Sequence, residues 1–242
     1  MNHGLENIFL IRHLQSLRNL GQGGDIPDCN VPLTPEGREQ SAVMGDRLGV
    51  LFGELGLAEK SVRVWCSPYL RTRQSRDITL GKISRYVRDS REDVLLTEWN
   101  FGLFDGLTEA ERFAKYPNEA AQYAESIRRH GKYYARPLNG ESWQDVCIRV
   151  RQFFGTITRD AEKADPVKNI AVFSHGLTIR AFVMMWLHLP VEWMESEKNP
   201  GNASVRRIGR DKDGKWHDFG NVFPGFAGEP PVSTGEPPVA KV

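Results

Sequence analysis

Short apolar runs alternate along the chain with longer segments in which apolar residues recur at helical spacing. Residues 8–11 and 170–173 are continuous apolar runs, as expected for strands buried on both faces of a sheet. Residues 62–66 alternate as a further strand, and residues 94–97 are a short strand candidate. The pattern therefore predicts strands separated by segments long enough to form helices.

Helix start signals follow two of these strands. Thr34-Pro35 and Ser67-Pro68 each combine an N-cap residue with a proline suited to the first helical position. They predict helices over residues 34–52 and 67–80. Both helices would lead back across the sheet to the next strand.

Capping-box spacing marks further helices in the second half of the chain. Thr108 and Ser142 are each followed three residues later by an acidic side chain. Residues 108–130 are therefore expected to form two helical stretches separated by a proline, and Ser142 to open a helix with one apolar face. Another helix is expected over residues 177–187.

Alternation of strands and helices predicts an α/β fold: a three-layer sandwich with a mostly parallel central sheet and helices on both faces. Residues 205–208 and 216–219 flank an Asp-Lys-Asp-Gly turn and predict a hairpin that adds antiparallel edge strands. We expect a single domain over residues 1–220. In the tail, residues 221–242, a Gly-Glu-Pro-Pro-Val pentamer occurs twice, which predicts a flexible segment or, alternatively, an extended ligand for a partner.

The composition is that of an ordinary globular protein. Of 242 residues, 40% are hydrophobic and 26% are charged, and 32 basic against 31 acidic residues leave a net charge of +1. This balance argues against a general nucleic-acid or anionic-membrane binder. No segment has the length and apolar character of a membrane span, and no secretion signal is visible.

Cysteine and histidine usage narrows the picture further. The three cysteines, Cys29, Cys66 and Cys147, are widely spaced, which favours free thiols in a reducing compartment. We therefore expect a cytoplasmic protein. The six histidines show no metal-ligand spacing, so no metal or cofactor is predicted.

Two histidines occupy equivalent positions. His13 and His175 each come directly after a buried apolar run, preceded by Arg12 and Ser174. Ligands of open α/β sheets bind at the carboxyl ends of strands, so both imidazoles would face one crevice if the strands are central and parallel. Arg71, in the first turn of a predicted helix, would add a guanidinium suited to phosphate. Packed histidines and a solvated arginine are the alternatives.

Five short motifs follow one another in a fixed order. They are Arg12-His13-Leu14-Gln15-Ser16 with Asn19 three residues later, Ser67-Pro68-Tyr69-Leu70-Arg71-Thr72, Leu96-Thr97-Glu98 with Gly102 and Gly106, Gly140-Glu141-Ser142, and Ser174-His175-Gly176. Together they resemble the motifs of the histidine phosphatase superfamily, which includes cofactor-dependent phosphoglycerate mutase. The resemblance extends from about residue 8 to residue 219 and implies a phosphoglycerate mutase-like fold.

The resemblance also implies a role for each matching residue. His13 would attack phosphorus and become phosphohistidine, and Glu98 would protonate the leaving oxygen and then activate water. Charges on the phosphoryl oxygens would be stabilised without a metal. The residues implied to bind these oxygens are Arg12, Asn19, Arg71, His175 and Gly176, of which Arg12, Arg71 and His175 would also be catalytic.

One residue departs from the family pattern. Leu14 stands where family members usually have glycine. A branched side chain needs more space and excludes the dihedral angles that only glycine adopts. It would narrow the pocket, reposition His13, or pack beneath it.

Three functions remain open on the sequence alone. Hydrolysis of a small-molecule phosphoester is favoured, because Trp99 and Asn100 replace the Arg and His usual in phosphoglycerate mutases. Residues 117–140 also lack a match to the substrate-closing insertion of mutases. The alternatives are a mutase-type phosphotransferase and a non-catalytic phosphate-binding module. The oligomeric state is left open.

Overall fold

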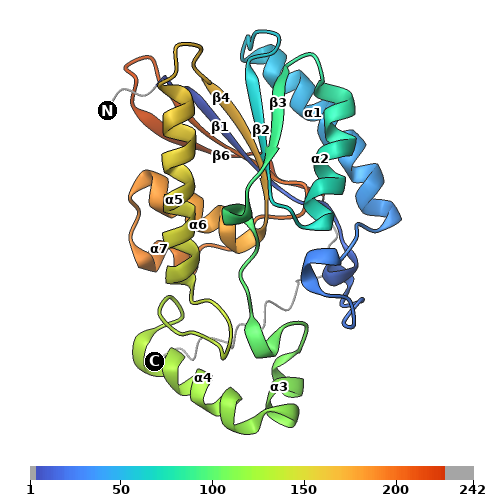
Figure 1. Cartoon of the computed structure of the whole chain (residues 1–242), viewed down its shortest axis with the longest axis vertical. Coiled ribbons are helices and arrows are strands. Elements are labelled where there is room, and N and C mark those ends of the chain that lie inside the picture. The colour runs from blue at the N-terminus through green and yellow to red at the C-terminus, as the bar shows by residue number, and fades with distance from the viewer. Residues whose placement is uncertain (1–3, 227–242) are drawn as a thin grey trace.

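A six-stranded mixed sheet forms the centre of the computed structural model, which describes residues 4–226 (Figure 1). The strand order is β3-β2-β4-β1-β5-β6. Strands β1, β2, β3 and β4 are parallel, whereas β5 pairs with β1 and β6 with β5 in antiparallel fashion. The strands are β1 (Asn7–Arg12), β2 (Val62–Cys66), β3 (Val87–Glu92), β4 (Asn169–Ser174), β5 (Val205–Arg210) and β6 (Trp216–Phe223).

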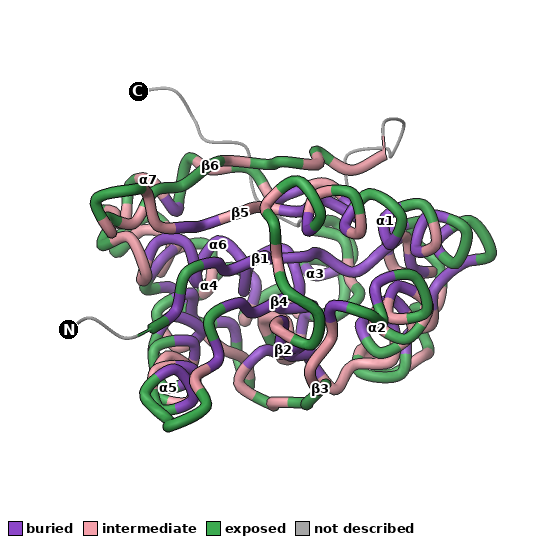
Figure 2. The backbone as a smooth tube through the Cα atoms, turned by 90° about the horizontal axis from the view of Figure 1, so that it is seen from above, coloured by how far each residue is buried: buried purple, intermediate pink, exposed green. Residues whose placement is uncertain are grey.

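Helices cover both faces of this sheet, which confirms the predicted α/β sandwich. Helices α1 (Pro35–Glu54) and α2 (Leu70–Ile83) pack on one face, and α5 (Trp143–Ala161) and α6 (Gly176–Leu187) on the other. Two apolar clusters separate the layers, one on each side of the sheet. Figure 2 shows the central strands buried and the outer helix surfaces exposed.

A small helical lobe extends from one end of the sandwich. It contains α3 (Glu109–Lys115) and α4 (Pro117–His130), which lie below the sheet in the view of Figure 1. The proline between them begins α4, as the sequence predicted. A short helix, α7 (Val191–Ser196), follows α6.

Three of the four predicted helix caps are confirmed. The Thr34 hydroxyl accepts from the backbone N–H of Gly37 at 3.0 Å, and Thr108 and Ser142 form complete capping boxes. The prediction for Ser67 was wrong, because α2 begins at Leu70 with Tyr69 as its N-cap. The Ser67 hydroxyl instead bonds Nε2 of His175.

The third predicted strand was also misplaced. Residues 94–96 form a 3₁₀ turn, capped by the Asp93 carboxylate, which accepts from the N–H of Leu95 at 2.9 Å. The strand is β3, immediately before this turn, with the polar sequence Val-Arg-Asp-Ser-Arg-Glu. It lies at the edge of the sheet, where one face is solvated, so its residues carry no apolar run.

The predicted C-terminal hairpin forms, but β6 continues past the predicted end at residue 219 to Phe223, so residues 221–223 belong to the sheet rather than to the tail. Its turn is closed by Asp211, which accepts backbone N–H bonds from Asp213 and Lys215 at 2.9 Å each. Both Pro-rich pentamers lie outside the described residues, so the predictions for the tail are untested. Within residues 4–226, no helix has the length and apolar character needed to cross a bilayer.

Candidate active site

The two histidines lie side by side at the carboxyl ends of adjacent strands. Strands β1 and β4 pair with Arg12 opposite Ser174, so His13 and His175 leave the sheet at the same level. Their ring centroids are 5.2 Å apart and the ring planes are inclined by 58°. The predicted proximity of the two imidazoles at the carboxyl ends of the strands is confirmed, and it follows directly from this parallel register.

His13 is buried and held in one orientation by the backbone. Its Nδ1 lies 2.8 Å from the carbonyl oxygen of Leu14, and an amide oxygen can only accept, so Nδ1 carries the proton. The Nε2 lone pair is then available for attack. Burial, followed by the charges of Arg71 and Arg12, holds the pKa of His13 well below its usual value of 6.5. The His13 ring is therefore neutral at neutral pH.

Ser67 holds His175 in the same Nδ1-protonated tautomer as His13. Its Nε2 lies 2.8 Å from the Ser67 hydroxyl oxygen, which itself accepts from the N–H of Tyr69 at 3.4 Å. Among the described residues the fully buried Ser67 hydroxyl has no other acceptor for its own proton, so we direct that proton at Nε2 and assign the ring proton of His175 to Nδ1. This Nδ1 is buried and has no hydrogen-bond partner within residues 4–226. As a buried donor without a partner, the Nδ1–H group is available to an acceptor atom of a ligand beside the two rings.

Arg12 and Arg71 bring positive charge to both rings. Burial and then Arg71 are the largest causes that lower the pKa of His175, as they are for His13. Both arginine side chains are buried. Arg12 donates to the carbonyl oxygen of Pro200 at 2.6 Å. Arg71 donates to Asp28, which the sequence analysis did not identify because it lies in a loop without an apolar pattern.

Asn19 is oriented by the residue at the start of its 3₁₀ turn. Its Oδ1 accepts from the backbone N–H of Ser16 at 2.9 Å and from the Ser16 hydroxyl at 2.8 Å. Because both bonds end on the oxygen, the amide Nδ2 is left to donate elsewhere. This matches the donor role that the family resemblance implies for Asn19.

Glu98 is half-buried, and hydrogen bonds hold both its carboxylate and its backbone carbonyl group in place. Its Oε1 accepts from the N–H of Trp99 at 2.9 Å and lies 3.4 Å from the hydroxyl of Thr178, on the first turn of α6. Arg149, which is half-buried, donates to the carbonyl oxygen of Glu98 at 3.2 Å and to that of Leu95 at 2.7 Å. Thr178 and Arg149 are positioning residues that no sequence signal identified.

Gly176 begins α6 directly after His175. A Cβ at this position would lie 3.1 Å from Cγ of Asn199. The chain at residues 199–200 therefore packs against the start of the helix, and Pro200 also binds Arg12. The main-chain N–H groups at the start of a helix favour anions, in line with the implied role of Gly176.

Leu14 packs beneath the crevice rather than into it. Its side chain is fully buried in the apolar cluster of α1, α2 and the sheet, together with Leu33 and Met44. Its φ is not in the left-handed region, so the residue carries no glycine-like strain. Its N–H donates to the hydroxyl of Ser75 at 3.1 Å. Of the three predicted consequences of this substitution, the structure shows packing beneath His13.

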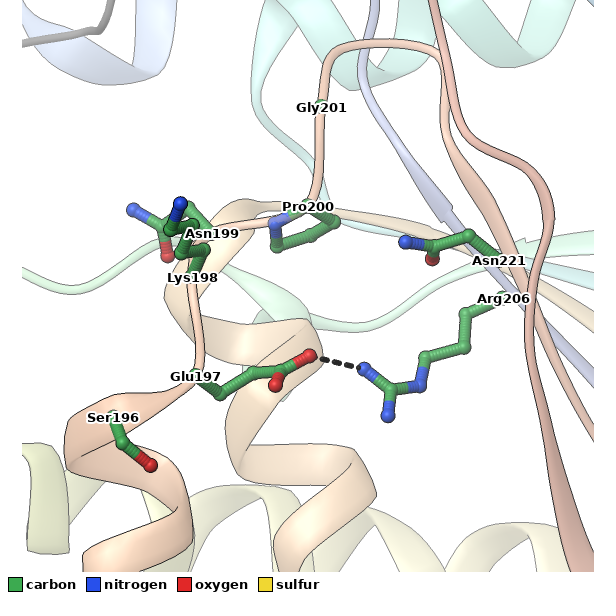
Figure 3. Close-up of a pocket in the computed structure, with 8 residues that line it drawn as sticks. All are labelled: Ser196, Glu197, Lys198, Asn199, Pro200, Gly201, Arg206 and Asn221. Carbon is green, nitrogen blue, oxygen red and sulfur yellow. Dashed lines mark hydrogen bonds and ion pairs between the residues drawn. The ribbon is translucent and has the colours of Figure 1, made fainter.

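A separate cavity of about 430 Å³ lies behind Pro200 (Figure 3). An ion pair of 2.9 Å between Glu197 and Arg206 spans its wall. None of the predicted site residues lines it, but two of its lining residues adjoin them: Asn199 lies beside Gly176, and the Pro200 carbonyl oxygen accepts from Arg12. In the part of the chain that the structure describes, no group of three His, Cys, Asp or Glu side chains is placed to hold a metal ion.

Comparison with known proteins agrees with this geometry. The profile of the histidine phosphatase superfamily (branch 1) matches residues 8–221. Phosphoglycerate mutase-like protein AT74H of Arabidopsis thaliana is 33% identical over 214 residues, which cover 83% of this chain and 73% of that protein. A 2,3-bisphosphoglycerate-dependent phosphoglycerate mutase of Gloeobacter violaceus is 29% identical over 198 residues, 78% of each chain. The chain belongs to the histidine phosphatase superfamily.

Solved structures show the same fold. An alpha-ribazole phosphatase from Shigella flexneri aligns with a TM-score of 0.70 at 18% identity, over 93% of this chain and all of that one. A mycobacterial glucosyl-3-phosphoglycerate phosphatase, solved as a complex with VO3, aligns with a TM-score of 0.65 at 23% identity, over 88% and 97% of the two chains. The chain thus has the architecture shared by phosphatases and phosphoglycerate mutase-like enzymes of the superfamily.

Proposed function

We propose that the protein hydrolyses phosphomonoesters of small molecules through a phosphohistidine on His13. The observation that carries the proposal is the pairing of the two imidazoles. His13 presents an unprotonated Nε2, and His175, 5.2 Å away between ring centroids, presents a buried and unpartnered Nδ1–H. One ring can attack phosphorus while the other donates to a phosphoryl oxygen.

The first chemical step transfers the phosphoryl group to the protein. Nε2 of His13 attacks phosphorus in line with the ester oxygen, and the P–O bond to the alcohol breaks. Glu98, in its protonated form, gives its proton to the departing oxygen. Arg12, Arg71 and the Nδ1–H of His175 stabilise charge on the phosphoryl oxygens. The carbonyl oxygen of Leu14 stabilises the positive charge that develops on His13.

The second step returns the protein to its starting state. Glu98, now a carboxylate, takes a proton from water as the water oxygen attacks phosphorus. The N–P bond breaks, inorganic phosphate leaves, and His13 recovers its neutral form with the proton still on Nδ1. Arg149 and Thr178 keep Glu98 in place for both steps through the contacts described above.

Two internal contacts support hydrolysis over mutase chemistry. The indole N–H of Trp99 donates to the carbonyl oxygen of Glu141 at 2.5 Å, and the Asn100 side chain accepts from the N–H of Gly102 at 2.9 Å. The indole N–H of Trp99 and the side-chain oxygen of Asn100 are thus hydrogen-bonded within the protein, at positions where mutases carry Arg and His. The non-catalytic alternative rested on Leu14 and on the Pro-rich repeat. Leu14 packs in the apolar cluster beneath the site, whereas the repeat lies outside the described residues.

Release of phosphate from p-nitrophenyl phosphate tests the proposal. The wild-type chain is expected to turn over and His13→Ala to be inactive. Interconversion of 3- and 2-phosphoglycerate, with bisphosphoglycerate present, should be slower than hydrolysis. Isomerisation faster than hydrolysis would reverse the preference. We further propose a cytoplasmic location, which three free thiols, one of them exposed, support.

A further inference from the structure

The guanidinium of Arg71 is already bound to a carboxylate of its own chain. Its Nη1 donates to Oδ1 of Asp28 at 3.0 Å and its Nη2 to Oδ2 at 3.1 Å, and Nη1 also donates to the Asp28 carbonyl oxygen at 2.6 Å. The Arg71 side chain is 4% exposed and that of Asp28 is 21% exposed. This is a two-point ion pair, with the same fork geometry with which arginine binds phosphate.

A phosphoryl group and Asp28 therefore need the same donors. The centre of the Tyr69 ring lies 5.0 Å from the Arg71 guanidinium carbon and 5.0 Å from the centre of the His175 ring. Arg71 is also the largest charge influence on both imidazoles, so its guanidinium lies close to the histidine pair. We propose that Asp28 is an internal competitor that substrate displaces from Arg71, and that this exchange sets the affinity of the site for phosphate. The inference rests on the proposed role of Arg71 in binding the phosphoryl group.

The structure offers the displaced carboxylate a second partner. Nε of Arg18 lies 3.7 Å from Oδ1 of Asp28, and Nη2 of Arg18 lies 3.4 Å from Asp105. Asp28 can move from one arginine to the other without losing a cationic neighbour. The hydrogen bond between Arg71 and the Asp28 carbonyl oxygen does not involve the carboxylate. The Asp28 side chain can therefore move away from Arg71 while the backbone of the loop stays in place.

Competition of this kind has a quantitative signature. The apparent dissociation constant of any ligand that needs Arg71 is the intrinsic constant divided by the fraction of molecules in which Arg71 is free. That fraction is a property of the unliganded protein. Removing Asp28 should therefore strengthen binding of different phosphate-like anions by one common factor. Simple charge repulsion by Asp28 would instead affect a dianion more than a monoanion.

Asp28→Asn tests this, with Asp25→Asn as its matched control. Asp25 is an exposed residue of the same loop, so the control makes the same charge change away from Arg71. We expect Asp28→Asn to bind inorganic phosphate about tenfold more tightly by calorimetry, and vanadate by the same factor as an inhibitor. Asp25→Asn should stay within about twofold of wild type. Asp28→Ala must show the same gain, which excludes an effect of the new amide.

Arg71→Gln completes a double-mutant cycle with Asp28→Asn. It also separates the proposal that Asp28 competes for Arg71 from the proposal that Arg71 binds the phosphoryl group. In this background Asp28→Asn should give no gain, because Asp28 has nothing left to compete for. No gain in the single variant, a gain that differs between the two anions, or a gain that persists in Arg71→Gln would each overturn the inference. If Arg71→Gln weakens phosphate binding while Asp28→Asn changes nothing, only the competitor fails. If Arg71→Gln binds phosphate as wild type does, the proposed phosphate site itself fails.

Cys29 gives an independent readout of the exchange. It is exposed and adjacent to Asp28, whereas Cys66 and Cys147 are buried. An aromatic disulfide reagent should therefore modify Cys29 alone, and Cys29→Ser should remove the signal. Saturating phosphate should change the modification rate in wild type but not in Asp28→Asn. Equal responses of the two proteins would contradict displacement of Asp28.

Discussion

The Nδ1 of His13 lies 2.8 Å from the backbone carbonyl oxygen of Leu14. The one residue that departs from the family motif thus orients the proposed nucleophile through its main chain, which any residue type supplies. The Leu14 side chain packs in the apolar cluster formed by α1, α2 and the sheet, and it has no exposed surface. The main chain of Leu14 therefore serves the proposed catalysis and its side chain serves packing. Substitution of the side chain tests the two contributions separately.

Leu14→Gly should destabilise the protein without improving it as an enzyme. Removal of a fully buried leucine side chain, together with the glycine entropy, should lower the free energy of unfolding by about 3–5 kcal/mol. The kcat for p-nitrophenyl phosphate should not rise at a temperature where both proteins are folded. Leu138→Gly, at a position that is 52% exposed, should cost less than about 1.5 kcal/mol. A large gain in kcat for Leu14→Gly would show that the leucine obstructs the site.

Ser67→Ala should release His175 from its assigned tautomer. Without the hydroxyl proton on Nε2, the ring can carry its own proton there and present Nδ1 as an acceptor, which repels phosphoryl oxygens. We expect kcat to fall about 10- to 100-fold, and ¹⁵N chemical shifts to show loss of the Nδ1–H form. Ser67→Thr should retain most activity, and Ser61→Ala, at a half-buried serine before the opposite end of β2, should change nothing. An unchanged tautomer in Ser67→Ala would contradict the assignment.

Glu98→Gln should discriminate between leaving groups. An amide cannot protonate the departing oxygen, so esters of poorly acidic alcohols should suffer most. We expect a loss of about 10²- to 10⁴-fold for an alkyl phosphate and a clearly smaller loss for p-nitrophenyl phosphate, whose phenolate leaves without help. Glu109→Gln, on the exposed start of α3, is the control. Equal losses of activity with both substrates would contradict the assignment of Glu98 as proton donor.

Stability should fall as the pH drops below about 6.5, in part because of the two buried histidines. Burial and Arg71 lower the pKa of both His13 and His175 in the folded chain. Below the ordinary pKa the unfolded chain binds protons that the folded chain does not, so acidification favours unfolding. Each histidine adds up to about 1.4 kcal/mol per pH unit to this slope.

Denaturant unfolding at pH 7 and pH 5 measures this contribution. The loss of unfolding free energy between the two pH values should be smaller in His13→Asn/His175→Asn than in wild type. His130→Asn, at an exposed position, should leave the loss unchanged. An identical loss in the double variant and wild type would show that the two rings take up protons in the folded chain as readily as in the unfolded one.

The fold was predictable where burial leaves a mark in the sequence. Strands β1 and β4 are buried on both faces and appear as continuous apolar runs, so their positions and the pairing of His13 with His175 could be inferred. Strand β3 was missed because it is a polar edge strand. Its edge position depends on the order of the whole sheet, which no local pattern encodes.

The proposed site was predictable in its residues but not in its contacts. His13, Arg71 and the other motif residues could be named from the resemblance, and the fold brings the two rings together. The hydroxyl of Ser67 was assigned to a helix cap, because a Ser-Pro pair favours one locally, whereas the bond to His175 arises only in the folded chain. Asp28 reaches Arg71 from a loop 43 residues earlier in the chain, as the separation of the bonded pair shows.

Trapping of the phosphorylated protein tests the central claim most directly. Wild-type chain is mixed with p-nitrophenyl phosphate and quenched after a fraction of one turnover in alkaline denaturant, in which phosphohistidine survives, and its peptides are analysed by mass spectrometry. We expect one phosphoryl group on His13, formed and lost at rates that account for kcat, and none in His13→Ala. Undiminished hydrolysis by His13→Ala, or turnover with the phosphoryl group on another residue, would contradict the account.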